Sequence, residues 1–241
     1  MHGSFYGWYM KCQSDTQTLA VIPAVHNTGR KRTCSIQVIT DDAWTVTFNS
    51  DVFQRTKWNI FIEENRFGKE GIHLAIHMLQ LTIEGKLNFG PLSLLKYDIM
   101  EPFVFLPFME CCHSVWSMRH SVRGNVYING QEYAFRNAWG YWEGDRGRSF
   151  PKEYIWTQCC FPDGAIMLSV ADIPAAGIHY TGVIGVILWQ GKEYRMATYL
   201  GAKAVQIGNN MVRVIQGSLE LEVRMLKASG RPLKAPAKGI W

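Results

Sequence analysis

The sequence of 241 residues predicts an all-β fold in which antiparallel strands form a barrel or a sandwich of two packed β halves. Short runs of alternating apolar and polar residues recur along the chain and are rich in Val, Ile, Thr and aromatic residues. Turn residues separate these runs, and the pair Asn129-Gly130 is typical of a hairpin. Because no long stretch shows a clear helical period, we expect little helix.

The first half of the chain is expected to form an antiparallel meander. Its runs end at turn residues such as Asn27-Thr28-Gly29 and Asp41-Asp42. Because the gaps between runs are short, consecutive strands are expected to pair. The predicted strands are Phe5–Cys12, Thr18–Val25, Thr33–Ile39, Trp44–Phe48 and Asn59–Glu63.

The stretch Ile72–Leu87 is the one early region where a helix competes with strand. His73 and His77 are four residues apart, so a helix would place them on one face as a candidate metal pair. However, apolar residues alternate with period two from Ile72 to Met78, and no acidic residue stands between the histidines as a zinc hydrolase helix requires. We therefore predict strand, with both histidines pointing away from the core.

An irregular segment follows and is interpreted as the internal boundary. Gly90–Pro107 contains several prolines and glycines among large apolar residues, a pattern that excludes a central strand. Such a loop either covers the open end of a core or forms the floor of a ligand pocket. The sequence thus predicts an N-terminal β half over residues 1–100 and a C-terminal β half over residues 101–241.

The C-terminal half is expected to be a further series of strands joined by hairpins. Turn signals occur at Gln190-Gly191-Lys192 and Gly208-Asn209-Asn210, whereas 228–241 is a polar tail without a closing strand. The predicted strands are Cys111–Val122, Val126–Phe135, Tyr154–Phe161, Ala165–Asp172, His179–Trp189, Glu193–Leu200, Ala204–Ile207, Met211–Gln216 and Ser218–Leu226.

Composition and charge argue against several classes of protein. The hydrophobic share of 47% is enough for a large core, and the formal charge of +5 is scattered rather than striped, which does not favour nucleic-acid binding. No run of eighteen apolar residues occurs, and the N-terminus is neither a secretory signal nor a transit segment, so we expect a cytoplasmic location. The triplet Arg30-Lys31-Arg32 is interpreted as a solvated loop or as a contact to phosphate or a membrane surface.

Neither a metal nor a cofactor is expected from the motifs. The six cysteines include the adjacent pairs Cys111-Cys112 and Cys159-Cys160, and side-by-side cysteines bridge each other badly. We interpret them as buried, reduced thiols, since no Cys-x-x-Cys occurs. The sequence also lacks a phosphate-binding glycine loop after a strand and a Gly-x-Ser-x-Gly motif.

The stretch Gly140–Gln158 concentrates charge and aromatic rings. It contains Glu143 and Asp145 together with three cations and five aromatic residues, and Gly144 and Gly147 are spaced like the pivots of a tight turn. Because a buried charge is unfavourable unless it is paired or used, the stretch is interpreted either as a structural ion-pair corner or as a binding site.

The same stretch carries a family resemblance. Trp-Glu-Gly-Asp-Arg-Gly-Arg-Ser-Phe-Pro at 142–151, followed by Tyr-Ile-Trp-Thr-Gln at 154–158, resembles the signature segment of the tocopherol cyclase-like family. The segments Tyr6–Lys11, Pro102–Cys111 and Leu168–Pro174 agree with that family in order, so the resemblance covers nearly the whole chain. Members of the family usually continue past this length, and we expect a short form or a fragment.

The resemblance implies a lipocalin-like fold with an apolar cavity and closure of a chroman-type ring on a prenylated phenol or quinol. That reaction needs an acid that stays protonated, aromatic faces that stabilise a tertiary cation, and a dry pocket. Glu143 and Asp145 are the catalytic candidates, because burial among aromatic rings favours the neutral form of a carboxyl group. The candidate substrate-binding residues are Trp8, Tyr9, Glu110, His113, Tyr141, Trp142, Arg148, Lys152, Trp156 and Gln158.

Structural interpretations stay open for several of these residues. Asp145 is also explained as a buried ion pair with Arg146 or Arg148 that fixes a corner between strands, and ion pairing favours the charged form of an acid. His113 and His120 are candidates either for accepting the phenol proton or for structural hydrogen bonds.

Three functions are consistent with the sequence. The first is a cyclase without a cofactor that protonates a lipophilic, prenylated aromatic substrate. The second is a lipocalin-like carrier of the same kind of ligand, and the third is a hydratase that adds water to an alkene. Fold similarity alone does not choose among them. A peripheral membrane contact and a homodimer formed through an unclosed sheet are further expectations.

Overall fold

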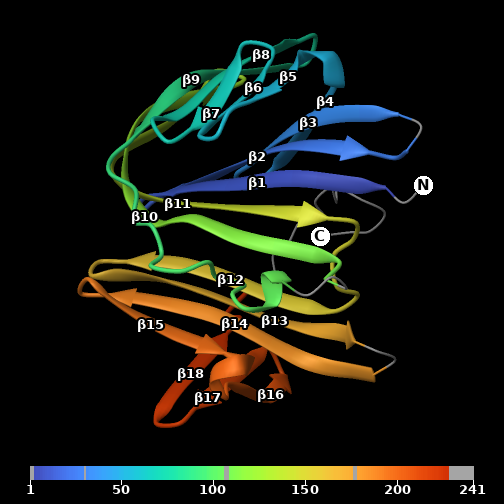
Figure 1. Ribbon diagram of the computed structural model, residues 1–241. Helices are drawn as coiled ribbons and strands as arrows, with labels where there is room; N and C mark the ends of the chain where they lie inside the picture. Colours follow the sequence, from blue (N-terminus) through green and yellow to red (C-terminus); the bar gives the residue numbers. More distant parts are fainter. Residues whose placement is uncertain (1–2, 30, 106–108, 176–177, 228–241) are drawn as a thin grey trace.

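The computed structural model describes residues 3–29, 31–105, 109–175 and 178–227. Within these residues it contains eighteen strands and three one-turn 3-10 helices. The strands form three antiparallel sheets, which Figure 1 shows as successive tiers from the blue and green sheet to the red one. The predicted all-β antiparallel fold is therefore confirmed.

The largest sheet contains the first eleven strands of the chain. They are β1 (Ser4–Gln13), β2 (Thr18–Asn27), β3 (Arg32–Ile39), β4 (Ala43–Asn49), β5 (Phe53–Arg55), β6 (Asn59–Ile62), β7 (Asn65–Gly68), β8 (Gly71–Met78), β9 (Leu81–Phe89), β10 (Cys111–Ile128) and β11 (Gln131–Gly147). Their order is β4-β3-β2-β1-β11-β10-β9-β8-β7-β6-β5. All neighbours except β1 and β11 are consecutive in sequence, as a meander predicts. The β1–β11 pair joins the two wings of the sheet.

The first sheet curls around a core of its own. Phe48 near one edge and Ile60 near the other belong to the same buried cluster as Trp8 and Trp142 at its centre. Successive side chains of a strand point to opposite faces, so Tyr9, next to Trp8, packs instead against a second cluster. The sheet thus has an inner face that fills a barrel-like core and an outer face that contacts the next sheet.

The remaining strands form two smaller sheets. The strands are β12 (Tyr154–Phe161), β13 (Gly164–Ala175), β14 (Ile178–Trp189), β15 (Lys192–Ala197), β16 (Lys203–Gly208), β17 (Met211–Gln216) and β18 (Leu219–Arg224). One sheet has the order β12-β13-β14-β15 and the other β16-β17-β18. Tyr141 of β11 is buried with Met167 of β13 and Val186 of β14, so the first two sheets share a core. The short helices are η1 (Ser50–Val52), η2 (Phe103–Phe105) and η3 (Thr198–Leu200).

The change from the first sheet to the second falls between β11 and β12. β10 and β11 come after the irregular segment 90–105, yet they pair with β9 and β1 of the first sheet. One continuous sheet therefore includes strands from both sides of residue 100. The division into residues 1–100 and 101–241 stays a prediction.

Local sequence signals position most of the turns correctly. Asn129 and Gly130 connect β10 to β11 with φ angles of 49° and 84°, the left-handed conformation that this pair favours. His73 and His77 lie on strand β8 and are exposed, as the period of two predicts. β10 was expected to break near Gly124, but the strand continues through a bulge there.

A few short elements differ from the expectations. β5 and β7 have only three and four residues, too few for an alternating pattern to stand out. The strand expected over Glu193–Leu200 ends at Ala197, and Thr198–Leu200 forms η3. The tail 228–241, Arg30, and residues 106–108 at and just after the end of the expected linker lie outside the described residues.

The stretch Gly140–Gln158 is not a tight turn. Residues up to Gly147 belong to β11, and only 148–153 connect this strand to β12. The glycines allow close packing instead: a Cβ on Gly144 would lie 3.1 Å from two indole rings, and a Cβ on Gly147 would lie 2.1 Å from the carbonyl oxygen of Glu110.

All six cysteines are free, as expected, but not all are buried: Cys159 is exposed. No helix among the described residues is long and apolar enough to cross a membrane.

We predict that Gly147→Ala lowers the free energy of unfolding by about 1 to 3 kcal/mol, because the new methyl group would push β11 away from the backbone of β10. Gly7→Ala on the neighbouring strand is the matched control, since its Cβ would lie an ordinary 3.7 Å from the side chain of Ala24. Urea denaturation followed by tryptophan fluorescence measures both variants. Equal stability of the two would contradict the close approach at Gly147.

Candidate active site

A cavity of about 820 Å³ lies between the outer face of the first sheet and the four-stranded sheet. Strands β1 to β3, β10 and β11 form one wall, β12 to β14 form the other, and the connection 148–153 closes part of the rim. Its size is typical of pockets for small organic molecules. The walls are largely apolar, with Ile22, Ile39, Met100, Phe103, Ile173 and Ile184 among them.

Strand register places three ionisable side chains together on this wall. β10 and β11 pair so that His113 lies opposite Asp145, and β1 and β11 pair so that Tyr9 lies opposite Glu143. Glu143 and Asp145 are two residues apart on β11 and therefore share a face, whereas Trp142 points to the other one. Opposed residues of an antiparallel pair have Cβ atoms about 5 Å apart, so their side chains can bond directly.

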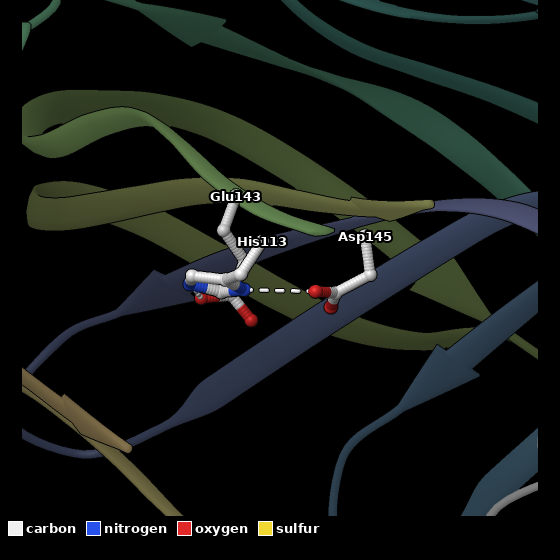
Figure 2. A group of neighbouring side chains, drawn as sticks. All are labelled: His113, Glu143 and Asp145. Atoms are coloured by element: carbon white, nitrogen blue, oxygen red, sulfur yellow. Dashed lines mark hydrogen bonds and ion pairs between the residues drawn. The ribbon is translucent and has the colours of Figure 1, made fainter. Parts of the chain in front are cut away.

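Figure 2 shows His113 with the two carboxyl groups of Glu143 and Asp145. Its Nδ1 lies 2.9 Å from Oδ1 of Asp145, and its Nε2 lies 3.2 Å from Oε2 of Glu143. All three side chains are buried. In the described part of the chain neither acid pairs with a lysine or arginine, and Arg146 and Arg148 are exposed. The alternative of an Asp145–arginine corner is therefore wrong.

The two oxygens of Glu143 have different surroundings. Oε2 accepts a hydrogen bond from the hydroxyl of Tyr141 at 2.5 Å and one from the indole N–H of Trp156 at 3.2 Å. The same oxygen lies 3.2 Å from Nε2 of His113. Among the described residues, none donates a hydrogen bond to Oε1, and Figure 2 shows one oxygen of Glu143 turned away from the imidazole. Glu143 lines the cavity, and Oε1 is its oxygen without a hydrogen-bond donor among the described residues.

Burial and mutual charge set the protonation of this cluster. Burial raises the pKa of Glu143, and the charge of Asp145 raises it further, while His113 and Tyr141 partly oppose this. Burial lowers the pKa of His113, but Glu143 and Asp145 outweigh burial when they are ionised and hold that pKa well above its usual value. The favoured state is an imidazolium paired with the Asp145 carboxylate beside a neutral Glu143, at pH values where a free glutamic acid is ionised.

The same three residues are chemically suitable as metal ligands, since one atom from each lies within 4.8 Å of the others. However, the two ring nitrogens of His113 face different carboxyl groups, so the three groups form a chain rather than converge on one point. The hydrogen bonds from Tyr141 and Trp156 also occupy the oxygen of Glu143 that lies nearest to the imidazole. The arrangement fits proton transfer better than metal binding.

The cavity wall includes both predicted catalytic acids. Glu110 and Lys152 also line the cavity but are exposed, and Glu110 accepts a hydrogen bond from the hydroxyl of Ser149 at 3.0 Å. Because Glu110 is exposed, it lacks the enclosure in a dry pocket that the proposed acid requires. The predicted site residues on the wall are Tyr9, Glu110, His113, Glu143, Asp145, Lys152 and Trp156.

Trp8 and Trp142 do not belong to this wall. Both point into the core of the first sheet, where Trp142 stacks on Trp116 with 5.4 Å between the ring centroids. Each is adjacent in sequence to a cavity residue, and adjacent residues of a strand face opposite sides. Their expected role in substrate binding is therefore not supported by where they lie.

Three other predicted residues lie beside the wall rather than on it. Tyr141 is buried behind Glu143 and holds its carboxyl group. Gln158 accepts a hydrogen bond from the ammonium group of Lys11 at 3.1 Å, a contact that links β12 to β1. The side chain of Arg148 is exposed, and its backbone N–H donates to the carbonyl oxygen of Glu110.

His120, the other candidate proton acceptor, has a structural role. Its Nδ1 lies 2.9 Å from the hydroxyl of Ser117, and its ring packs on Phe89. Burial lowers the pKa of His120 to about 3, so the ring stays neutral.

Cys111 and Tyr154 are cavity residues that the sequence analysis missed. The thiol of Cys111 donates to Oδ1 of Asp145 at 3.7 Å, and burial followed by the charge of Asp145 raises the pKa of Cys111 and that of Tyr154. Cys111 lies two residues before His113 on the same strand face, a relation that the sequence could have revealed. The wall formed by β13 and β14 shows only the ordinary alternation of a strand.

The sequence matches no known family model and no curated protein. Solved structures share its fold: kievitone hydratase from Nectria haematococca aligns with a TM-score of 0.60 and 9% identity over 97% of this chain and 79% of that one. CghA with Sch210972 aligns with a TM-score of 0.58 and 10% identity over 98% and 80%, and a putative AttH from Nitrosomonas europaea with 0.55 and 10% over 94% and 81%. Identities this low show the fold alone. The lipocalin-like fold is confirmed, while a relation to tocopherol cyclases specifically is not shown.

We predict that the midpoint of thermal unfolding falls as the pH rises and that Glu143→Gln weakens this dependence. The pKa of Glu143 is raised by folding, so its contribution is complete below the ordinary value of 4.5 and is lost as the pH rises through the folded value. The raised pKa of His113 changes stability in the same direction. Its contribution to the free energy of unfolding is complete below pH 6.5, the ordinary pKa of histidine, and is lost as the pH rises through the raised pKa of the folded state. Calorimetry from acidic to alkaline pH measures the effect.

Glu84→Gln is the control for this series, because Glu84 is an exposed acid on strand β9 of the same sheet. It should keep the wild-type pH dependence. If Glu143→Gln also kept it, the raised pKa of Glu143 would be contradicted.

Proposed function

We propose that this protein is a cyclase-like enzyme that protonates a double bond of a lipophilic, prenylated phenol or quinol and closes a chroman-type ring. The observation that supports this most is the position of Glu143, a buried acid that lines an apolar cavity of about 820 Å³ and has one oxygen to which none of the described residues donates. Protonation of an alkene needs a neutral acid, because a carboxylate has no proton to give.

The groups around Glu143 are suited to the cation that protonation creates. The rings of Tyr9 and Trp156 meet edge to face with 5.3 Å between their centroids, and both line the cavity. A cation beside an aromatic face gains about 0.5 to 2 kcal/mol from each ring. Trp156 provides this face while its N–H holds Oε2 of Glu143, so acid and ring are fixed relative to each other.

Ring closure on this wall is balanced without a further reactant. The proton on Oε1 passes to one alkene carbon, and the phenol oxygen then bonds to the cationic carbon. The phenol proton returns to Glu143, which regenerates the acid, and the product is an isomer of the substrate. Apolar walls favour this outcome because they limit the water that competes for the cation.

The second candidate function is that of a hydratase. The fold that this chain shares with kievitone hydratase supports this alternative. The exposed residues Glu110 and Lys152 on the cavity wall indicate an opening to solvent through which water can enter. Hydration would use the same acid but would trap the cation with water. A carrier explains the site less well, because binding an apolar ligand does not require three buried ionisable groups.

We predict that Glu143→Gln lowers turnover of a geranyl-substituted hydroquinone by about a hundred- to ten-thousandfold, because the amide has a similar shape but cannot supply the proton. Binding, followed by quenching of tryptophan fluorescence, should stay close to wild type. Glu110→Gln is the matched control, since it removes an exposed carboxyl group from the same cavity wall. Chromatography of the isomeric product measures turnover.

Three results of this experiment have distinct meanings. Equal turnover by wild type and Glu143→Gln would remove Glu143 from the mechanism. Binding without conversion of any prenylated quinol would favour the carrier. A product heavier by one water, with label incorporated from oxygen-18 water, would replace the cyclase with the hydratase.

A further inference from the structure

Building on this proposed function, we propose that His113 and Asp145 form a positioning pair for Glu143. Asp145 fixes the imidazolium of His113, and this imidazolium is the counter-charge for the carboxylate that Glu143 becomes when it releases its proton. Both residues act through Glu143 rather than on the reacting atoms. The pair therefore allows one acid to give a proton and take another back within a single turnover.

The pair is held by the backbone of two long strands. His113 and Asp145 are directly opposed in the β10–β11 register, and the Nδ1–Oδ1 distance is 2.9 Å. An imidazole held at Nδ1 presents Nε2 in one fixed direction, and here Nε2 meets Oε2 of Glu143 at 3.2 Å. The oxygen beside the imidazole is therefore Oε2, and Oε1 is the oxygen to which none of the described residues donates.

Among the described residues, the counter-charge of His113 is Asp145 while Glu143 is neutral, and both acids are counter-charges once Glu143 has released its proton. β11 contributes Glu143 and Asp145, and the remaining titratable neighbours from β1, β10, β11 and β12 are neutral. Burial raises the pKa of each of these neighbours, which keeps their protons in place. They are the phenols of Tyr9, Tyr141 and Tyr154 and the thiol of Cys111.

The charge of the cluster explains why the pair is needed. Before proton transfer the imidazolium and the Asp145 carboxylate cancel, and Glu143 is neutral. When the Oε1–H bond breaks and a C–H bond forms, the electron pair stays on Glu143, and a second carboxylate arises in a buried site. Without His113, two carboxylates would share that site, which strongly disfavours the transfer. The return proton comes from the oxygen that traps the cation.

Nitrogen-15 NMR of histidine-labelled protein tests the pair without any substrate. In the wild type we expect both nitrogens of His113 to carry protons well above pH 6.5, the ordinary pKa of histidine. His113→Asn identifies the resonance among the seven histidines. Asp145→Asn should make His113 lose its proton at a lower pH. A His113 with one proton at neutral pH in the wild type would overturn the proposal.

Asp172→Asn is the matched control for Asp145→Asn. It removes a carboxylate that lies 2.7 Å from Nδ1 of His179, the same kind of pair but exposed to solvent. Solvent screens that pair, so the variant should leave both the His113 resonance and turnover unchanged. A shift of the His113 resonance in Asp172→Asn would show that the change in Asp145→Asn is not local, and would overturn the assignment.

The pH–rate profile provides a second readout, which would not change if His113 and Asp145 had only a structural role. Asp145→Asn should lower kcat by about a hundredfold through loss of positioning, with the melting temperature as a check of folding. His113→Gln removes a positive charge that lowers the pKa of Glu143, so the alkaline limb of the pH–rate profile should move to higher pH while kcat falls. If kcat fell in His113→Gln but the alkaline limb of the pH–rate profile stayed in place, the role of His113 as the counter-charge of Glu143 would be contradicted.

The two proposals fail separately. If NMR shows a doubly protonated His113 that depends on Asp145 but no prenylated quinol is converted or hydrated, the pair stands and the proposed function fails. If a substrate is converted while His113 is neutral in the wild type, the function stands and the pair fails.

Discussion

The register of β11 against its two neighbours is the constraint on which the site depends. It sets His113 opposite Asp145 and Tyr9 opposite Glu143. A slip of one residue would turn Glu143 and Asp145 into the aromatic core and move Trp142 to the cavity, because a strand alternates its faces with period two. The Asn129-Gly130 turn fixes this register at one end of the hairpin, and the close approach at Gly147 limits it at the other. The chemistry of the site is therefore coupled to the stability of the sheet.

The inner face of the same strands explains how the sheet tolerates three buried ionisable groups. Trp8, Trp116 and Trp142 pack behind them, and burial of such large rings contributes much of the stability of a core. Nδ1 of His113 is hydrogen-bonded to Asp145, and Tyr141 donates a hydrogen bond to Glu143. Nε2 of His113 has no hydrogen bond in the described residues but lies within ion-pair distance of Glu143. A site on long, paired strands holds its geometry better than one on the connecting loops would.

Local patterns in the sequence predict most of the strands and hairpins, because these depend on residues close together in the chain. They also identify Glu143 and Asp145 as acids among aromatic rings. They miss the place of His113 between the two acids, since that depends on pairing across more than thirty intervening residues. Trp142 was assigned to the substrate because its charged stretch was interpreted as a turn, whereas Trp8, on the predicted strand Phe5–Cys12, was open to either a core or a pocket role. Once 140–147 is known to be a strand, alternation against Glu143 assigns Trp142 to the core, and alternation against Tyr9 does the same for Trp8.

The proposed acid and the wall opposite it come from different sheets. Glu143 and its partners lie on the first sheet, whereas Ser169 and Ile184 line the cavity from β13 and β14 of the second. Protonation creates the same cation whichever oxygen attacks it, so the outcome depends on how the second sheet folds the substrate and how much water it admits. In this view, the first sheet supplies the reactivity and the second supplies the selectivity.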